Sequence, residues 1–368
     1  MARILVTGGC GFIGRHVVEE LIYGGHEVRI LDALIAQVHQ DVETAVPAEA
    51  EIVRADVRDG SAVRRALKGV TKVVHLAAEV GVGQSMYEIA RYVGTNDLGT
   101  AVLLEAMIGL PIERIVVASS MSVYGEGRYV SETGEPLEVV RCFGHRTAGH
   151  GWDPVGADGG AITPVPTDEA KPADLHSIYA LTKFAQERQV LIFGRAYGIA
   201  AVALRLFNVF GAGQALANPY TGVLANFASR LANRQPPIIF EDGQQRRDFV
   251  HVRDVARAFR LALEEPQAAG EAINIGSGRS YSIEDVARLL AREMAVPHIA
   301  PEITGKARSG DIRNCFADIS KAKRLLGFEP RQILERSLED FAHWVRRSGA
   351  IDRGPEMRRQ LEERGLVS

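Results

Sequence analysis

Short apolar runs alternate with helical patterns along most of the chain. The first run, RILVT at 3–7, is apolar and β-branched, which predicts a buried parallel strand. A glycine-rich turn follows, and then 16–25 shows the apolar spacing of an amphipathic helix. Because this alternation recurs, we expect an α/β fold, a parallel sheet covered by helices. Further strands are expected at 26–32, 51–54, 72–78, 114–120, 201–211 and 271–278, and helices at 61–69, 86–107, 282–294 and 318–328. The segment 218–235 is expected to form a loop and a helix, and 337–349 to close the C-terminal part.

A glycine motif separates the first strand from its helix. Gly8, Gly11 and Gly14 follow the strand as G-x-x-G-x-x-G. Such glycines permit a tight turn and the close approach of a pyrophosphate to a helix N-terminus. The second strand ends at Asp32, where a carboxylate binds the adenosine ribose hydroxyls and repels a 2′-phosphate. The strand, loop, helix and acidic residue together predict bound NAD rather than NADP.

A second motif lies in the middle of the chain. Tyr179 and Lys183, in SIYALTK, are four residues apart, so a helix places them on one face. A free tyrosine has a pKa of about 10, and use as a base near neutral pH needs that pKa lowered by roughly 3 units. A buried Lys183 ammonium and an oxidised nicotinamide would supply much of this, with the Ser120 hydroxyl sharing the proton. The alternative is an ordinary helix pair with no catalytic role.

Composition narrows the class of protein. The chain has 368 residues, 46% of them hydrophobic, and a formal net charge of -3. A nucleic-acid binder would usually carry a basic surplus. Three scattered cysteines form no disulfide framework, the N-terminus does not read as a signal peptide, and no apolar run is long enough to cross a membrane. We therefore expect a cytoplasmic globular protein without nucleic-acid or membrane partners.

The motifs in combination resemble a known family. TGGCGFIG, Asp32, HLAA, SSMSVYG and SIYALTK together look like the extended short-chain dehydrogenase/reductase family, and within it the nucleotide-sugar epimerases and dehydratases. The resemblance extends to about Pro330. It implies a Rossmann-type doubly wound parallel sheet that binds NAD, and a smaller α+β C-terminal lobe that binds a nucleoside diphosphate sugar. Tyr179 is then the base, Lys183 its electrostatic partner and Ser120 the hydroxyl partner.

The resemblance also implies domain limits and binding residues. We predict an NAD-binding domain at 1–206 with 247–276, a substrate lobe at 207–246 with 277–348, and a charged, solvated tail at 349–368. Cofactor contacts are expected at Gly8, Gly11, Phe12, Ile13, Gly14, Asp32, Asp56, Val57, Leu76, Ala77, Ala78, Asn96, Tyr179 and Lys183. Substrate contacts are expected at Ser120, Ser122, Asn208, Asn218, Phe240, Arg247, Arg308 and Asp311, with the arginines as phosphate ligands.

One departure from the family pattern is an insertion. Tyr179 follows Ser120 by 59 residues, about twice the interval usual in the family. The excess, 126–172, is rich in Gly, Pro and charge, so we predict a surface excursion that is placed to fold over the sugar. It holds Cys142, His145 and His150, but a single cysteine without a paired motif favours loop residues over a zinc site.

A second departure discriminates between reactions. Sugar 4,6-dehydratases of the family carry an acidic pair just after the catalytic Ser or Thr, and decarboxylases usually carry a Glu there. Here those positions are Met121 and Ser122, which cannot act as general acid or base. Dehydration is therefore disfavoured, and a nucleotide-sugar 4-epimerase is the leading hypothesis. The chain looks most like dTDP-L-rhamnose 4-epimerases, with UDP-sugar epimerases second.

Three alternatives stay open at this point. A 4-ketoreductase or dehydrogenase would release its nicotinamide, and a dehydratase would need another acid and base. A non-catalytic NAD sensor on the same fold would be expected to lose Tyr179 or Lys183, and both are present. The resemblance further implies a homodimer formed by the helices around 96–107 and 180–195. Phe184, Val190, Leu191 and Phe193 are the candidate contact face, although a buried core face explains them equally well.

Overall fold

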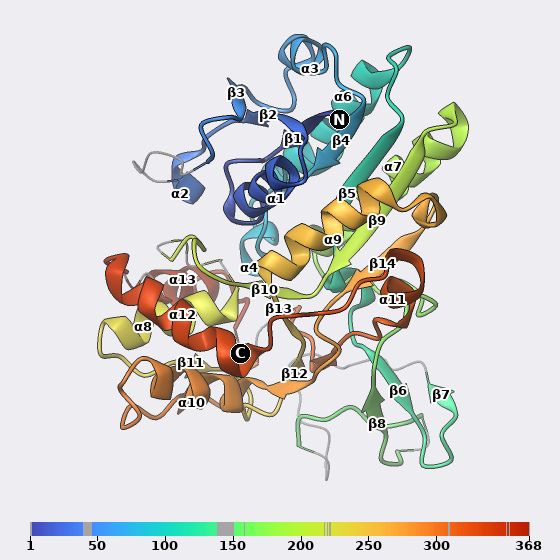
Figure 1. Cartoon of the computed structure of the whole chain (residues 1–368). Helices are drawn as coiled ribbons and strands as arrows, with labels where there is room; N and C mark the ends of the chain where they lie inside the picture. Colours follow the sequence, from blue (N-terminus) through green and yellow to red (C-terminus); the bar gives the residue numbers. More distant parts are fainter. Residues whose placement is uncertain are drawn as a thin grey trace.

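The computed structural model describes residues 2–39, 46–137, 151–157, 159–216, 218, 220, 222–307, 310–350, 352 and 354–367. Its centre is a seven-stranded parallel sheet in the order β14-β9-β5-β4-β1-β2-β3 (Figure 1). The strands are β1 (Arg3–Thr7), β2 (Glu27–Asp32), β3 (Glu51–Arg54), β4 (Lys72–His75), β5 (Arg114–Ser120), β9 (Ala200–Leu206) and β14 (Ala272–Ile275). The strand order reverses between β1 and β4, so the expected doubly wound α/β fold is confirmed.

Alternate strand residues bury themselves against two different helix layers. Ile4 and Val6 of β1 join one core cluster, and Leu5 between them joins the other. This period of two is what a sheet covered on both faces requires. The first layer contains α1 (Phe12–Tyr23), α9 (Val252–Glu264) and α11 (Ser320–Leu326); the second contains α3 (Gly60–Ala66), α6 (Gly99–Met107) and α7 (Ile178–Tyr197).

Helix α11 differs from the predicted domain limits. Those limits assign 277–348 to the substrate lobe, but Ala322 and Leu326 are buried in the cluster that includes Ile273 of β14. Helix α11 belongs with the sheet because it packs on the edge strand β14, whereas α9 packs on β5 and β9. The chain therefore returns to the sheet after it has built most of the lobe.

The helix expected at 86–107 is divided into several parts. A short α4 (Val82–Ser85) precedes α5 (Ile89–Tyr92), a π-helical segment at Val93–Leu98 and α6. Asn96 in the π segment is fully buried, and its side chain bonds to the backbone N–H of Glu79, to the carbonyl of Glu79 and to the hydroxyl of Thr182. The wider turn thus brings an amide toward the loop that follows β4.

A second group of elements lies beside the carboxyl ends of the sheet (Figure 1). Helices α8 (Val223–Ala232), α10 (Ile283–Glu293) and α12 (Leu334–Arg347) share a separate apolar core. Ser282 caps α10 by accepting from the backbone N–H of Asp285. Short strands complete the lobe: β10 (Asn208–Phe210) with β13 (Phe249–His251), β11 (Ile238–Ile239) with β16 (Glu302–Ile303), and β12 (Arg246–Arg247) between β15 (Tyr281–Ser282) and β17 (Asn314–Cys315).

The described part of the insertion forms a small sheet of its own. It consists of β6 (Arg128–Val130), β7 (Pro136–Leu137) and β8 (Thr163–Val165). The base of the insertion is not a surface excursion, because the side chains of Glu126 and Tyr129 are buried. Glu126 accepts hydrogen bonds from the backbone of Arg313 and Asn314, which anchors the insertion to the substrate lobe. Outside the insertion, three further short helices occur in the described chain: Ala36–His39 (α2), Met121–Tyr124 and Pro266–Ala268.

The predicted contact face of α7 is a core face. Val190, Leu191 and Phe193 are buried against the sheet, and Phe184 is partly buried, so the alternative interpretation of these residues is the correct one. Large apolar side chains are exposed elsewhere on this side of the molecule. They are Leu181 (45% exposed) and Ile192 (56%) on α7, and Ile89 (48%), Val93 (38%) and Leu98 (54%) on α5 and the π segment.

The tail also differs from its prediction as a solvated end. Helix α13 (Gly354–Glu362) is charged, but its Leu361 is completely buried. Gln360 accepts hydrogen bonds from the hydroxyls of Tyr87 (3.0 Å) and Tyr220 (2.6 Å), and the Arg364 guanidinium lies 4.2 Å from the centroid of the Tyr87 ring. These contacts hold α13 against the loop after β4.

A buried ion pair joins α7 to the sheet. The Glu187 carboxylate accepts two hydrogen bonds from Arg205 of β9, at 2.7 and 3.0 Å, and one from the Ser119 hydroxyl of β5. Arg205 also donates to the hydroxyl of Tyr124. Removing one partner of such a pair leaves an uncompensated charge in a dry interior.

We predict that Arg205→Met lowers the free energy of unfolding by about 3–5 kcal/mol, because Glu187 is left charged and unpaired. Urea denaturation followed by circular dichroism measures this. Arg3→Met is the control, since Arg3 pairs with Glu27 where both side chains are exposed and such pairs contribute about 1 kcal/mol or less. Equal losses in the two variants would contradict the prediction.

Candidate active site

A cavity of about 630 Å³ runs along the carboxyl ends of the sheet strands. The ends of β1, β2, β4 and β5 form one side, and segments of the substrate lobe form the other. This is where open α/β sheets bind their ligands, at the reversal of strand order.

The glycine loop has the geometry that a dinucleotide requires. Gly8 has a φ of 71°, and a Cβ on Gly14 would lie 2.1 Å from the Gly8 carbonyl oxygen. Helix α1 begins at Phe12, so its free N–H groups face the cavity. All five predicted loop residues line the cavity: Gly8, Gly11, Phe12, Ile13 and Gly14.

Asp32 is fixed at the end of β2. Its carboxylate accepts hydrogen bonds from the backbone N–H groups of Cys10 and Leu34, and the His39 ring lies 3.4 Å from it. Burial opposes ionisation, but the bonds from His39, Leu34 and Cys10 outweigh it and lower the pKa of Asp32. A carboxylate held charged at this position suits ribose hydroxyls and repels a phosphate.

The other predicted cofactor residues divide into two groups. Asp56, Val57, Leu76, Ala77 and Ala78 line the cavity. Asp56 forms an ion pair with Arg58 at 2.7 Å, which lowers the pKa of this partly exposed carboxyl. Asn96 is not part of the cavity lining, because its amide is directed at Glu79 and Thr182. Its side chain holds the loop after β4, and a contact of Asn96 with the cofactor stays a prediction.

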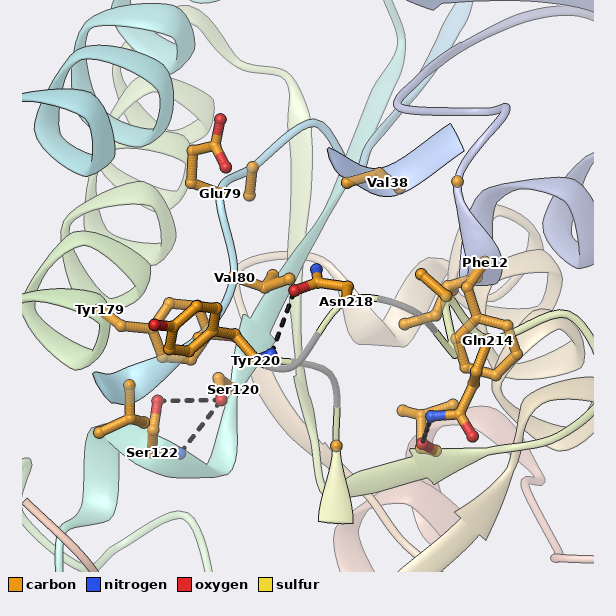
Figure 2. A pocket seen from close by; sticks show the side chains of 18 of the residues that line it. Phe12, Val38, Glu79, Val80, Ser120, Ser122, Tyr179, Gln214, Asn218 and Tyr220 are labelled. Carbon is orange, nitrogen blue, oxygen red and sulfur yellow. Dashed lines mark hydrogen bonds between the residues drawn. The ribbon is translucent and has the colours of Figure 1, made fainter. Parts of the chain in front are cut away.

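The catalytic candidates lie at the carboxyl end of β5 and in the first two turns of α7. Ser120 ends β5, and its hydroxyl accepts from the backbone N–H and the hydroxyl of Ser122 (Figure 2). Ser177 caps α7, and the backbone N–H of Tyr179 donates to the Ser85 hydroxyl, so the first turn of the helix is held from both sides. Ser120, Ser122, Tyr179 and Lys183 all line the cavity.

The electrostatics of Tyr179 and Lys183 are set by burial. Burial raises the pKa of Tyr179, and its hydrogen bond with Ser120 acts in the opposite direction. Burial lowers the pKa of Lys183 to about 7, and Glu187 opposes that change. Base catalysis needs a lowered tyrosine pKa, and the protein side chains alone do not lower it. A bound oxidised nicotinamide, whose ring is positively charged, would contribute to that lowering.

The predicted substrate residues lie across the cavity from the catalytic group. Asn208, Asn218, Phe240, Arg247 and Asp311 line it, and Arg308 falls outside the described residues. Arg247 already donates to the carbonyls of Arg246, Ile312 and Arg313. The guanidinium thus positions the 311–313 segment as well as facing the cavity.

Several lining residues were not predicted. Gln245 is buried and donates to the Phe240 carbonyl, while its own carbonyl oxygen has no hydrogen-bond partner among the described residues. Tyr220 lies beside Asn218, whose side chain accepts from its backbone (Figure 2). Arg358 and Leu361 of α13 also line the cavity. The sequence around these residues carries no motif, and only the fold brings them to the site.

The comparison with protein families decides the assignment. The model of the "NAD dependent epimerase/dehydratase family" matches residues 4–147 and 155–276. The chain belongs to this family.

Individual relatives cover nearly the whole chain. A dTDP-L-rhamnose 4-epimerase of Burkholderia thailandensis is 36% identical over 350 residues, covering 93% of this chain and 94% of the relative. A putative UDP-glucose 4-epimerase of Methanocaldococcus jannaschii is 33% identical, covering 93% and 98%. The UDP-glucose 4-epimerase of Thermus thermophilus, solved with NAD, superimposes with a TM-score of 0.75 at 30% identity, covering 95% and 100%.

This member of the family is thus an NAD-dependent epimerase, and the geometry of its cavity fits the cofactor. The loop around Gly14 leaves no room for a side chain, and the Asp32 carboxylate is held charged beside it. Among the described residues there is no cluster of three or more His, Cys, Asp or Glu side chains that would hold a metal ion. Cys142, His145 and His150 lie outside the described residues. No helix in the described part of the chain is long and apolar enough to cross a bilayer.

We predict that Gly14→Ala abolishes NAD binding, because the added methyl would lie 2.1 Å from the Gly8 carbonyl oxygen and displace the loop. The measurement is the nicotinamide released from the purified protein by acid. Gly60→Ala is the matched control, since a Cβ there meets its nearest atom at 3.6 Å. Retention of NAD by the Gly14 variant would contradict this account of the loop.

Proposed function

We propose that this enzyme inverts C4 of a nucleoside diphosphate hexose through a transient 4-keto sugar. The observation that carries the proposal is the convergence of Tyr179, Ser120 and Lys183 on one cavity, with Met121 and Ser122 at the positions next to them. Neither Met121 nor Ser122 offers the acid or base that elimination of water needs. Oxidation and reduction at a single carbon need a base, which Tyr179 supplies, and a hydride acceptor, which bound NAD would supply.

Tyr179 has the central role in the proposed reaction. Its phenolic oxygen takes the proton of the sugar 4-hydroxyl and returns it after inversion, while Ser120 donates to the 4-oxygen as its charge changes. Bound NAD would supply the hydride chemistry at C4, as acceptor and then as donor. The Lys183 ammonium stabilises the phenolate form. Because the cofactor is regenerated in each cycle, the protein has no need to release it.

The opposite wall of the cavity supports a nucleotide sugar as substrate. Asn208, Asn218 and Gln245 present side-chain amides, and the carbonyl oxygens of Asn208 and Gln245 have no hydrogen-bond partner in the described structure. Arg247 faces the same space, where a diphosphate would compensate its buried charge. We infer that a dTDP-6-deoxyhexose such as dTDP-L-rhamnose is the first candidate substrate, as for the Burkholderia relative, and a UDP-hexose the second.

The proposal is tested by a product assay without added NAD. Purified protein is given dTDP-L-rhamnose, UDP-glucose, UDP-glucuronate and GDP-mannose, and products are resolved by NMR of the sugar ring. Inversion at C4 supports the epimerase and identifies the substrate. Dependence on stoichiometric NAD(H) would instead indicate a ketoreductase or dehydrogenase, and a 4-keto-6-deoxy product would indicate a dehydratase.

We predict that Tyr179→Phe lowers kcat by about 10²–10⁴-fold, the range typical of general acid–base catalysis. Removing one hydroxyl leaves the ring and its edge contact with Tyr92, at 6.5 Å between centroids, in place. Bound NAD and the unfolding midpoint should therefore be unchanged. Tyr23→Phe, at an exposed site remote from the cavity, is the control. Normal turnover by the Tyr179 variant would contradict the mechanism.

We also propose that the protein is a cytoplasmic homodimer. Ile89, Val93, Leu98, Leu181 and Ile192 are exposed apolar residues on neighbouring helical segments. Exposed apolar side chains gathered on adjoining helices are typical of an interface.

We predict that Leu98→Glu together with Ile192→Glu converts the dimer to a monomer, because two charges would be desolvated on each side of the interface. Light scattering coupled to size exclusion measures the mass. Tyr23→Glu, an exposed site on α1 on the other face of the sheet, is the control. A wild-type protein that is already monomeric at micromolar concentration would overturn the proposal.

A further inference from the structure

Gln186 is buried next to Lys183 and was not assigned a role by its sequence. Its side chain is 1% exposed and lies one helical turn after Lys183 on the same face of α7. The Lys183 ammonium donates to its carbonyl oxygen at 2.7 Å. Because the oxygen faces the ammonium, the amide nitrogen of Gln186 must point the other way, into the sheet.

The nitrogen of Gln186 continues a chain of hydrogen bonds. It lies 3.2 Å from Nε2 of His75 and 2.9 Å from the Thr100 hydroxyl. Burial, with Lys183 adding to it, lowers the pKa of His75 to about 3, so the ring is neutral. One ring nitrogen of a neutral imidazole accepts and the other donates. The Thr100 hydroxyl donates to Asn96, so it cannot donate to Nε2 of His75, which lies 2.9 Å from it. Nε2 therefore donates to the Thr100 oxygen, and Nδ1 accepts from the Thr7 hydroxyl at 2.7 Å.

This chain ends at the wall of the cofactor site. The Thr7 oxygen accepts the backbone N–H of Ala77 at 3.2 Å, and Ala77 lines the cavity beside Gly8. The Thr100 hydroxyl is held in turn, because it donates to the carbonyl of Asn96 at 2.6 Å. Gln186 and His75 thus both donate to the Thr100 oxygen, and the chain reaches Ala77 through His75 and Thr7.

We propose that Gln186 is a positioning residue for the reaction: it holds the Lys183 ammonium toward Tyr179 and ties it to the strand ends that support the cofactor. The inference rests on the proposed function only in taking Tyr179 and Lys183 as the reacting pair. An uncharged partner is essential to this role. A carboxylate at 186 would hold the ammonium as firmly but would cancel the positive field that Tyr179 needs.

The other charged groups around Lys183 do not take over this task. Glu187 is adjacent, but its carboxylate is occupied by Arg205 of β9 and Ser119 of β5. His75 on β4 is neutral. On the remaining side, burial raises the pKa of Tyr92, so that phenol stays neutral beside Tyr179.

The inference predicts opposite shifts for two substitutions. The ammonium exists below the pKa of Lys183, so its loss forms the alkaline limb of the rate profile. Gln186→Glu should move that limb to higher pH by about one unit, because a carboxylate stabilises the charge. Gln186→Leu should move it to lower pH and lower kcat on the alkaline side by roughly tenfold, with KM unchanged, because the residue does not reach the sugar.

The experiment uses the NAD-loaded full chain and two readouts. The first is the pH profile of kcat and KM with the best sugar from the product assay. The second needs no sugar: the titration of the Lys183 side chain by NMR, assigned with Lys183→Arg. Gln189→Glu and Gln189→Leu, three residues further along α7 and outside the hydrogen-bond chain, are the matched controls and should shift neither readout.

The outcomes separate this inference from the proposed function. If the Lys183 titration is the same in wild type and both Gln186 variants, the positioning role is overturned, whatever sugar the enzyme uses. If the titration shifts as predicted while no nucleotide sugar is converted, the positioning role stands and the epimerase proposal falls. A loss of bound NAD or of cooperative unfolding in the conservative Gln186→Glu variant would show a merely structural role and would also overturn the inference.

Discussion

The ion pair between Glu187 and Arg205 fixes the helix that carries Tyr179 and Lys183, the proposed reacting groups. Glu187 belongs to the helix that carries Tyr179, and it is held by the strand that ends at Ser120 and by the next strand of the sheet. A helix packed only through apolar contacts has freedom to slide by fractions of an ångström. A buried, hydrogen-bonded charge pair removes that freedom, because any displacement leaves desolvated charges without partners.

The same pair reaches beyond the active site. Arg205 donates to Tyr124, and the Tyr124 hydroxyl donates to Asn274 on the edge strand β14. The amide of Asn274 donates in turn to the carbonyl of Thr167, where the insertion returns to the body of the protein. One connected set of polar groups therefore fixes the catalytic helix, three strands and the base of the insertion. Position in such a network explains why a residue is buried and polar without touching a ligand.

The sequence predicted the parts of the site that depend on local chemistry. Gly14 and Asp32 could be recognised because a turn, a helix start and a strand end each impose their own residue types within a few positions. Tyr179 and Lys183 could be recognised because four residues are one turn of a helix. The α/β fold followed from apolar periodicity, which is set by the two-sided burial of every central strand.

What was missed depends on contacts between distant segments. The sequence did not show whether Val190 and Phe193 belong to a core face or to an exposed one, although both are buried. Periodicity shows that a helix has an apolar side, but not what covers that side. Asn96 was expected at the cofactor, and only the π-helical turn reveals that its amide is used by Glu79 and Thr182. The helix around Leu361 carries so many charges that a single leucine gives no signal of burial.

Helix α13 affects the order in which the cavity is completed during synthesis. The cavity draws its walls from residues as far apart as Gly8 and Leu361, so nearly the whole described length of the chain must be assembled before the site is closed. During synthesis, which proceeds from the N-terminus, the sheet and glycine loop form long before α13 leaves the ribosome. A nascent chain thus passes through a stage in which it has the surfaces to bind a dinucleotide but an incomplete chamber for the sugar.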